Sequence, residues 1–346
     1  MQTCVILSGK LALTPETAER AGIRRPADVR LEVAGDLLVL ELTDRDRSAA
    51  EAVALHRGEL ALPLSAETLD LLGWQSGDVL GIEVVDERLE VRKLADPNDQ
   101  SLTTADEDGI PVPPHWLVQM VAGTTAIAPF VEGGHRVGKL FAGLIERHLP
   151  AAREPAIIDF GCGCGRVARL MPRYLDCGLH GCDITAPAIE WCRRNLPGEF
   201  FRSADEPPLA VPEARFDVLY AVSVLTHLDE RRQDAWLLEW QRIVRPGGLL
   251  LVTYRGDGFL ARGEPSRRER IERLWEPGGF GFTATDYWEG LFPAYYGGAY
   301  HQDAYVRDHW GRFFDVLELH ASGDTGLVQD LAVMRRRDEP SQAFGS

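Results

Sequence analysis

Long apolar runs are missing from this 346-residue sequence. The longest, such as residues 248–253, fall far short of the roughly 20 residues that span a bilayer. Residues 1–10 also lack the charged start and the cleavage site of a signal peptide. We therefore expect a soluble, cytoplasmic protein with no membrane partner.

Basic side chains are scarce relative to acidic ones, with 37 Lys and Arg against 53 Asp and Glu and a formal net charge of −16. Such a surface repels nucleic-acid phosphates and anionic lipid headgroups unless a local basic patch overrides it, and no such patch stands out in the sequence. The composition therefore predicts no nucleic-acid partner.

Cysteine is also scarce, with six in the chain, five of them between Cys162 and Cys192. This distribution excludes a secreted disulfide framework and predicts reduced thiols. No Cys-x-x-Cys pair occurs, and Cys162 and Cys164 lie inside a glycine-rich segment. We therefore predict no metal site.

A repeated pattern fills residues 9–42 and 58–94. Each copy has a glycine and alternating apolar residues, a short amphipathic stretch closed by Gly22 or Gly73, a turn, and a second alternating stretch. This order predicts a strand, a short helix and a hairpin. Because a unit of about 35 residues cannot bury an adequate core alone, we expect the copies to pack on each other as an internal pseudodimer within residues 1–95.

The second copy, with Gly58, Pro63 and the run from Leu72 to Asp78, resembles the AbrB-like swapped-hairpin family. The first copy departs from it, with Thr14-Pro15 displaced by one residue and Pro26-Ala27 where Pro-Gly would stand. The resemblance implies a small, mostly β domain that in many members binds DNA through basic residues.

This region holds 11 basic and 17 acidic side chains, and its two first strands offer only Lys10 and Glu59. We therefore expect a structural or docking role for this region. The cluster Arg24, Arg25 and Arg30 is the one feature that favours DNA binding instead.

Beyond an acidic linker at residues 96–109, strands and helices alternate. An amphipathic helix with apolar residues from Val137 to Leu149 precedes the first strand, and the alternation predicts an α/β, doubly wound, largely parallel sheet within residues 110–337. Residues 338–346 form a tail.

A glycine loop follows the first of these strands, in the run Ile157-Ile-Asp-Phe-Gly-Cys-Gly-Cys-Gly165-Arg166. The spacing predicts a strand, a tight turn and a helix whose amino terminus favours an anionic group. A dinucleotide-binding loop would have its third glycine at Arg166, so the pattern disfavours a nicotinamide cofactor. Asp183 ends the next strand and is placed to accept hydrogen bonds from ribose hydroxyls, which indicates a nucleoside.

Four motifs together resemble the class I S-adenosylmethionine-dependent methyltransferases: the segments 159–165, 182–183, 216–223 and 244–249, in that family's order and spacing. The resemblance implies a Rossmann-like, seven-stranded sheet and S-adenosylmethionine as cofactor. It further implies the residues that contact the cofactor. Asp159, Gly161, Cys162, Gly163 and Gly165 border its methionine moiety, Asp183 with its neighbour Ile184 holds the ribose, Asp205 lies near the adenine, and Ala221 and Ser223 line the channel to the sulfonium.

Residues 256–312 carry 12 of the chain's 29 aromatic residues and follow the fifth strand of the sheet. We expect an aromatic cap that binds the acceptor, with a subunit interface as the alternative.

His301 lies in a stretch resembling the Phe-His-Ser element of small-molecule methyltransferases, with Gln302 in place of Ser. We consider it an acceptor-site residue and general base, or a link between cap and sheet. His227, after the fourth strand, either faces the pocket or caps the helix that begins near Asp229.

The sequence thus predicts a methyltransferase that transfers the methyl group of S-adenosylmethionine to a small-molecule acceptor. The alternatives are a protein or peptide methyltransferase, and a DNA-binding regulator that senses the cofactor, which a gel-shift assay at low salt would reveal. The N-terminal domain and the aromatic cap are the candidate interfaces for a homo-oligomer.

Overall fold

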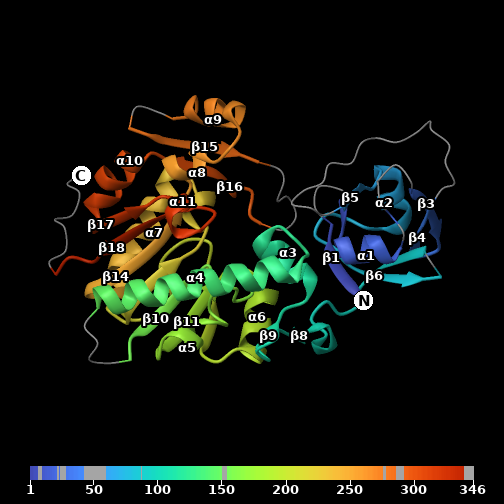
Figure 1. Cartoon of the computed structure of the whole chain (residues 1–346), viewed down its shortest axis with the longest axis horizontal. Helices are drawn as coiled ribbons and strands as arrows, with labels where there is room; N and C mark the ends of the chain where they lie inside the picture. Colours follow the sequence, from blue (N-terminus) through green and yellow to red (C-terminus); the bar gives the residue numbers. More distant parts are fainter. Residues whose placement is uncertain are drawn as a thin grey trace. The chain divides into compact units, whose positions relative to one another are not determined.

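The computed structural model describes residues 1–6, 10–21, 23, 29–42, 60–86, 88–149, 154–275, 278–285 and 292–338. Their contacts form two compact units (Figure 1). The first holds the described residues up to Phe130 together with 292–294, and the second holds those of 131–285 and 295–338.

The N-terminal unit has the repeated order that the sequence predicts. Its elements are β1 (Gln2–Val5), β2 (Lys10–Leu13), α1 (Pro15–Arg20), β3 (Val29–Ala34), β4 (Leu37–Leu42), β5 (Leu60–Pro63), α2 (Ala66–Leu72), β6 (Val79–Val85) and β7 (Arg88–Lys93). Equivalent strands of the two copies pair antiparallel, β2 with β5 and β4 with β7. The larger sheet has the order β1-β6-β7-β4-β3. Each copy therefore completes the sheets of the other.

Both short helices begin at a hydroxyl residue, which explains why they recur at the same place in each copy. The side chains of Thr14 and Ser65 accept hydrogen bonds from the backbone N–H groups of Thr17 and Thr68. Gly73 ends the second helix with a φ of +65°, a conformation that suits glycine. Several residues of the predicted repeat, and two of its basic side chains, lie outside the described residues: Gly9, Gly22, Arg24, Arg25, Pro26, Ala27, Gly58 and Glu59.

The stretch after the repeat is more structured than the predicted linker. It contains the 3-10 turn η2 (Gln100–Leu102), the paired strands β8 (Thr104–Ala105) and β9 (Pro111–Val112), and helix α3 (His115–Ala122). Gln119 of α3 accepts from Val5 N at 2.8 Å and donates to Val5 O at 3.3 Å. These hydrogen bonds attach α3 to the N-terminal unit. The boundary between the two compact units therefore lies near residue 130, and not at the expected residue 110.

The second unit is an α/β structure around one mixed sheet. Its strands are β10 (Ala156–Phe160), β11 (Gly178–Asp183), β12 (Glu199–Arg202), β13 (Phe216–Ala221), β14 (Val244–Tyr254), β17 (Asp315–His320) and β18 (Asp330–Arg335). The order β12-β11-β10-β13-β14-β18-β17 confirms the predicted seven-stranded sheet, with β17 and β18 antiparallel to their neighbours. The chain builds outward from β10 on one side and from β13 on the other, so the strand order reverses between them. Ligands of such sheets bind outside the carboxyl ends of the strands at this reversal.

Helices and turns connect the strands, and the segment between β14 and β17 has a small sheet of its own. These elements are α4 (Ile127–His148), α5 (Met171–Tyr174), α6 (Ala186–Asn195), η3 (Leu225–His227), α7 (Glu230–Ile243), α8 (Asp257–Ala261), α9 (Pro265–Glu272), β15 (Phe280–Ala284), β16 (Gly297–His301), α10 (Asp303–Asp308), η4 (Trp310–Arg312) and α11 (Ser322–Thr325). Trp236 and Trp240 of α7 pack on Phe160 of β10, with ring centroids 4.8 and 5.1 Å away. Among the described residues, no helix is both long and apolar enough to cross a membrane.

One local prediction was wrong. The helix expected directly after Gly165 begins only at Met171, because residues 163–170 form turns, one of them closed by Leu170 N on Val167 O. A four-residue helix gives no amino-terminal anion site. Residues 245–248 lie inside β14, where the pairing with β13 shifts register and Gly247 has a φ of +73°.

Candidate active site

The glycine loop lies at the carboxyl end of β10, at the reversal of strand order. Gly161, Gly163 and Gly165 have φ values of +73°, +52° and +75°, which side chains with a Cβ rarely adopt. A Cβ on Gly161 would lie 2.4 Å from Val224 Cγ2, and one on Gly165 would lie 2.5 Å from Leu196 Cδ1. The loop is therefore folded so tightly that only glycine fits at these positions.

Asp183, at the end of β11, holds this loop in place. Its Oδ2 accepts from Gly163 N and its Oδ1 from Thr185 N, each at 2.8 Å. Burial raises the pKa of Asp183, while these backbone donors act in the opposite direction. The side chain is only partly buried, so a bound nucleoside can reach it at the edge of the loop.

Asp159 lies deeper, one residue before the end of β10, and is 3% exposed. Burial raises its pKa to about 7, because the charged form is poorly solvated, while Tyr220 and Arg166 act in the opposite direction. At neutral pH this carboxyl group is therefore poised between its neutral and its charged form.

The thiols of the loop act as packing groups. Cys162 and Cys164 are buried, and burial raises the pKa of both well above that of a free thiol. Cys162 Sγ donates to Gly163 O at 3.5 Å, as does Cys192 Sγ. Within the described part of the chain, no group of three or more His, Cys, Asp or Glu residues is arranged to hold a metal ion.

The remaining cofactor candidates lie along the same edge. Ile184 follows Asp183, and its carbonyl accepts from Arg202 Nε at 3.1 Å. Asp205 is exposed and lies two residues beyond Ser203, whose N–H donates to Asp183 O at 3.0 Å. The structure thus brings the ends of β11 and β12 together beside the loop.

Ser223, after β13, has an unusual backbone and a fixed side chain. Its φ is +64°, which is rare outside glycine. Its N–H donates to Thr253 Oγ1 at 2.8 Å, and its Oγ accepts from Gln329 Nε2 at 2.8 Å. Thr253 Oγ1 in turn donates to Gln329 Oε1 at 2.7 Å. With the buried Ala221, this network fixes the wall of the predicted methyl channel.

His227 joins the end of η3 to the cap. Its Nδ1 donates to Gly297 O at 2.9 Å, and its ring stacks on Tyr296 at a centroid distance of 4.1 Å. Burial and the charge of Arg255 lower its pKa to about 3. Asp229 itself caps α7 through Arg232 N, so the structure does not support the interpretation of His227 as the cap.

His301, on β16, is fully buried among the rings of Tyr254, Phe280, Tyr305 and Trp310. Its Nε2 lies 3.0 Å from Oε1 of Gln233, whose amide nitrogen donates to Leu225 O and Leu228 O. The amide oxygen must therefore accept, and the proton of His301 is on Nε2. Burial is the main cause that lowers its pKa to about 3. This geometry favours a link between cap and sheet, and the catalytic role of His301 stays a prediction.

His301→Ala tests the two roles against each other. If the residue takes part in catalysis, the methylation rate falls about 100-fold or more while cofactor affinity stays nearly intact. If it is a link, stability and cofactor binding fall together, because a buried ring and a hydrogen bond are lost. Thermal unfolding, cofactor titration and single-turnover rates on the same sample separate these outcomes. Gln233→Leu serves as the control, since it removes the link and keeps the imidazole.

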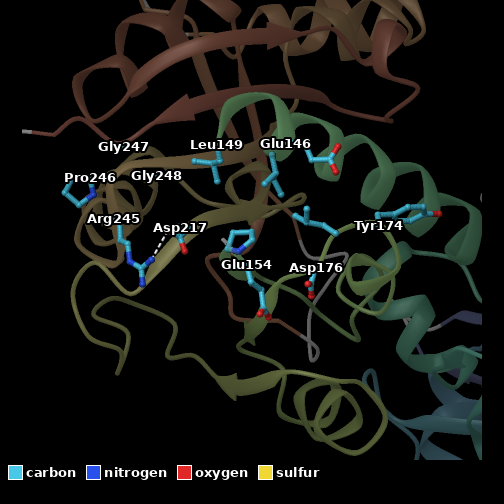
Figure 2. Close-up of a pocket in the computed structure, with 13 residues that line it drawn as sticks. Glu146, Leu149, Glu154, Tyr174, Asp176, Asp217, Arg245, Pro246, Gly247 and Gly248 are labelled. Carbon is cyan, nitrogen blue, oxygen red and sulfur yellow. Dashed lines mark hydrogen bonds and ion pairs between the residues drawn. The ribbon is translucent and has the colours of Figure 1, made fainter. Parts of the chain in front are cut away.

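A pocket of about 830 Å³ lies at the opposite edge of the sheet (Figure 2). Its lining includes residues just before the strands or at their amino ends, such as Pro155, Asp176 and Arg245. Figure 2 shows Arg245 directed at Asp217, and the two side chains form an ion pair at 2.8 Å. Because ligands of these sheets bind at the carboxyl ends of strands, this acidic pocket is not the candidate active site.

Sequence reasoning missed the residues that support the site from other elements. Thr253 lies on β14 and Gln329 directly before β18, and they form no motif with Ser223. Arg255 follows β14 and donates to Thr226 O at 3.1 Å, and no sequence signal marks it. Of the predicted aromatic cap, Tyr287 and Trp288 lie outside the described residues.

Residues 158–252, which contain the loop, Asp183 and Ser223, match the family model described as a methyltransferase domain. The chain is 37% identical over 128 residues to the tRNA (carboxymethyluridine(34)-5-O)-methyltransferase of Arabidopsis thaliana, covering 35% of this chain and 30% of that protein. It is 31% identical over 140 residues to the 27-O-demethylrifamycin SV methyltransferase of Amycolatopsis mediterranei, covering 38% and 48%. The chain thus spans about half or less of the length of these relatives.

Among solved structures, the chain is similar to the 1,6-didemethyltoxoflavin-N1-methyltransferase of Burkholderia thailandensis, which was solved with S-adenosylhomocysteine. That similarity has a TM-score of 0.42 and 14% identity, and covers 75% of this chain and 96% of the other.

Proposed function

We propose that this chain is a methyltransferase that transfers the methyl group of S-adenosylmethionine to a small-molecule nucleophile. The observation that carries the proposal is the glycine loop bound to Asp183 at the reversal of strand order, inside the segment that matches a methyltransferase domain. S-adenosylmethionine fits this site, because glycines without a Cβ let the backbone of the loop approach a ligand and the partly buried carboxylate of Asp183 is an acceptor for ribose hydroxyls.

When bound, S-adenosylmethionine supplies an activated methyl group that an in-line displacement transfers. The residues of this chain bind the cofactor and align its methyl group with the acceptor. Asp183 accepts from the ribose and keeps the loop in position, and Asp159 lies nearest the methionine moiety. Ser223, fixed by Thr253 and Gln329, forms the channel wall toward the acceptor. His227 and His301 belong to the acceptor side, where their low pKa values make them poor bases and suit them to positioning.

A small molecule is the proposed acceptor, although one relative is named for a tRNA substrate. The net charge of −16 disfavours a polyanionic RNA, and the rifamycin methyltransferase among the relatives is named for a small-molecule acceptor. The aromatic segment between β14 and β17, held to η3 through His227, is the proposed acceptor cap.

For the N-terminal unit we propose an AbrB-like pseudodimer with a structural or docking role and no DNA binding. Support comes from the paired equivalent strands and from the acidic balance of the sequence. This unit and the cap are also the proposed interfaces of a homo-oligomer, and we propose the cytoplasm as its location.

Mass spectrometry of metabolite extracts incubated with the protein and methyl-labelled S-adenosylmethionine tests the function. We expect label in at least one small molecule and its absence with Asp183→Ala. Label confined to proteins or RNA in a whole-cell extract, or transfer by the variant at the wild-type rate, would contradict the proposal.

A further inference from the structure

Arg255 directly follows β14 and lies beside the predicted methyl channel. Its Nη1 donates to Thr226 O at 3.1 Å, and Thr226 Oγ1 lies 3.1 Å from Ser223 Oγ. On the other side, its guanidinium carbon lies 5.5 Å from the centroid of the Tyr300 ring. The side chain thus extends between η3 and β16, where the sheet edge meets the cap.

The charge of Arg255 has no counter-ion in the part of the chain that the structure describes. Three partly buried arginines of the same unit have one: Arg242 with Glu239, Arg245 with Asp217 and Arg232 with Asp229, at 2.6, 2.8 and 2.5 Å. Two others, Arg215 and Arg335, contact the ring of His180 and the carbonyl of His148 instead. Arg255 instead has the carbonyl of Thr226 and Tyr300, whose ring it faces and whose side chain hydrogen-bonds to it. A guanidinium has five N–H donors, so most of its hydrogen-bonding capacity is left for a ligand.

The groups around Arg255 do not supply negative charge. Burial, together with the charge of Arg255, keeps His227 and His301 neutral, with pKa values near 3. Burial raises the pKa of Tyr296, so this phenol is neutral as well. Burial also lowers the pKa of Arg255 itself. A partly buried cation among neutral groups is unfavourable unless an anion joins it.

We propose that Arg255 binds a carboxylate of the methyl acceptor, so that the acceptor is an organic carboxylic acid. This rests on the proposed function. The planar guanidinium matches a carboxylate with two parallel hydrogen bonds, and the rings of Tyr296 and Tyr300 offer apolar surface to the rest of the molecule.

Arg255 anchors the acceptor and does not activate it. When an anionic nucleophile attacks the sulfonium, the opposite charges of the two groups are neutralised as the new bond forms. An arginine on the attacking oxygen would therefore favour the charged ground state over the transition state and slow the reaction. The carboxylate on Arg255 is a binding group, and another atom of the acceptor attacks.

Direct binding to the full chain tests this without knowledge of the natural acceptor. The probes are matched pairs, 3-phenylpropanoate with 3-phenylpropanamide and octanoate with octanamide, titrated by ligand-observed NMR with and without S-adenosylhomocysteine. We expect at least one acid to bind about tenfold or more tightly than its amide, because only the acid accepts charge-assisted hydrogen bonds from Arg255. Phenyl phosphate is titrated in the same way, to test whether the site prefers a phosphate to a carboxylate.

Three variants locate the effect. Arg255→Gln should abolish the preference for the acid. Arg255→Lys should keep part of it, since lysine retains the positive charge but lacks the two parallel N–H donors of the guanidinium. Arg270→Gln, which removes an exposed charge from α9, should leave the preference intact. The proposal is wrong if no acid binds more tightly than its amide, if Arg255→Gln keeps the preference, or if phenyl phosphate binds more tightly than the acids. Titration of S-adenosylmethionine on the same samples reports separately on the proposed function.

Discussion

Replacing Asp183 with alanine should weaken S-adenosylmethionine binding by about 10- to 100-fold, the loss expected for charged hydrogen bonds of about 1.5–3 kcal/mol. The carboxylate has two tasks in the structure. It accepts from Gly163 N, which fixes the glycine loop, and it offers lone pairs to the ribose hydroxyls. Both are lost in Asp183→Ala, and isothermal titration calorimetry measures the result.

Two further variants make this test specific. Asp176→Ala removes an exposed carboxylate just before the same strand, β11, at the other edge of the sheet, and should bind the cofactor as the wild type does. Asp183→Asn keeps an acceptor oxygen and should lose less affinity than Asp183→Ala. Unchanged affinity in Asp183→Ala would remove the assignment of a nucleoside to this site.

Affinity for S-adenosylmethionine should rise several tens of fold between pH 5 and pH 7 and level off above about pH 7. The cause is Asp159, whose pKa burial raises to about 7. The methionine moiety carries positive charge, which favours the ionised carboxylate. Below pH 7 binding must therefore release a proton, and affinity changes by up to about tenfold per pH unit.

The same pKa makes a prediction for the protein without cofactor. The folded pKa of Asp159 exceeds 3.8, the ordinary value of an aspartate, so the folded state binds this proton more tightly than the unfolded state. Its contribution to stability is fully present below about pH 4 and is lost as pH rises through about 7. In Asp159→Asn both pH dependences should flatten. A cofactor affinity that stays constant from pH 5 to pH 7 in the wild type would contradict the placement of Asp159 beside the methionine moiety.

The sequence predicted the sheet, and the position of the glycine loop and Asp183 at the carboxyl ends of its strands, because both depend on local patterns. Alternating strands and helices determine a doubly wound order, and the glycines between Gly161 and Gly165 mark a backbone that residues with a Cβ rarely adopt. The ends of parallel strands meet at one edge, so Asp183 had to lie near the loop.

The acceptor side could not be predicted in the same way. His301 has the residue type of a base, but whether it faces a ligand or a core depends on rings that come from β14, β15, α10 and η4. The sequence likewise does not show that Arg255 lacks a counter-ion, because that follows from which carboxylates lie within reach after folding. The helix expected after Gly165 failed for a local reason, since turns continue as far as Leu170.

The strand pairing of the N-terminal unit, β2 with β5 and β4 with β7, also determines how this unit responds to dilution. Where two separate chains supply such strands, folding and association are one equilibrium, and stability falls as the protein is diluted. Here one chain supplies both halves, so the pairing is intramolecular and does not by itself make the midpoint of unfolding depend on protein concentration. Each half is also free to change its exposed surface without the other, because no symmetry operation forces a substitution to appear twice.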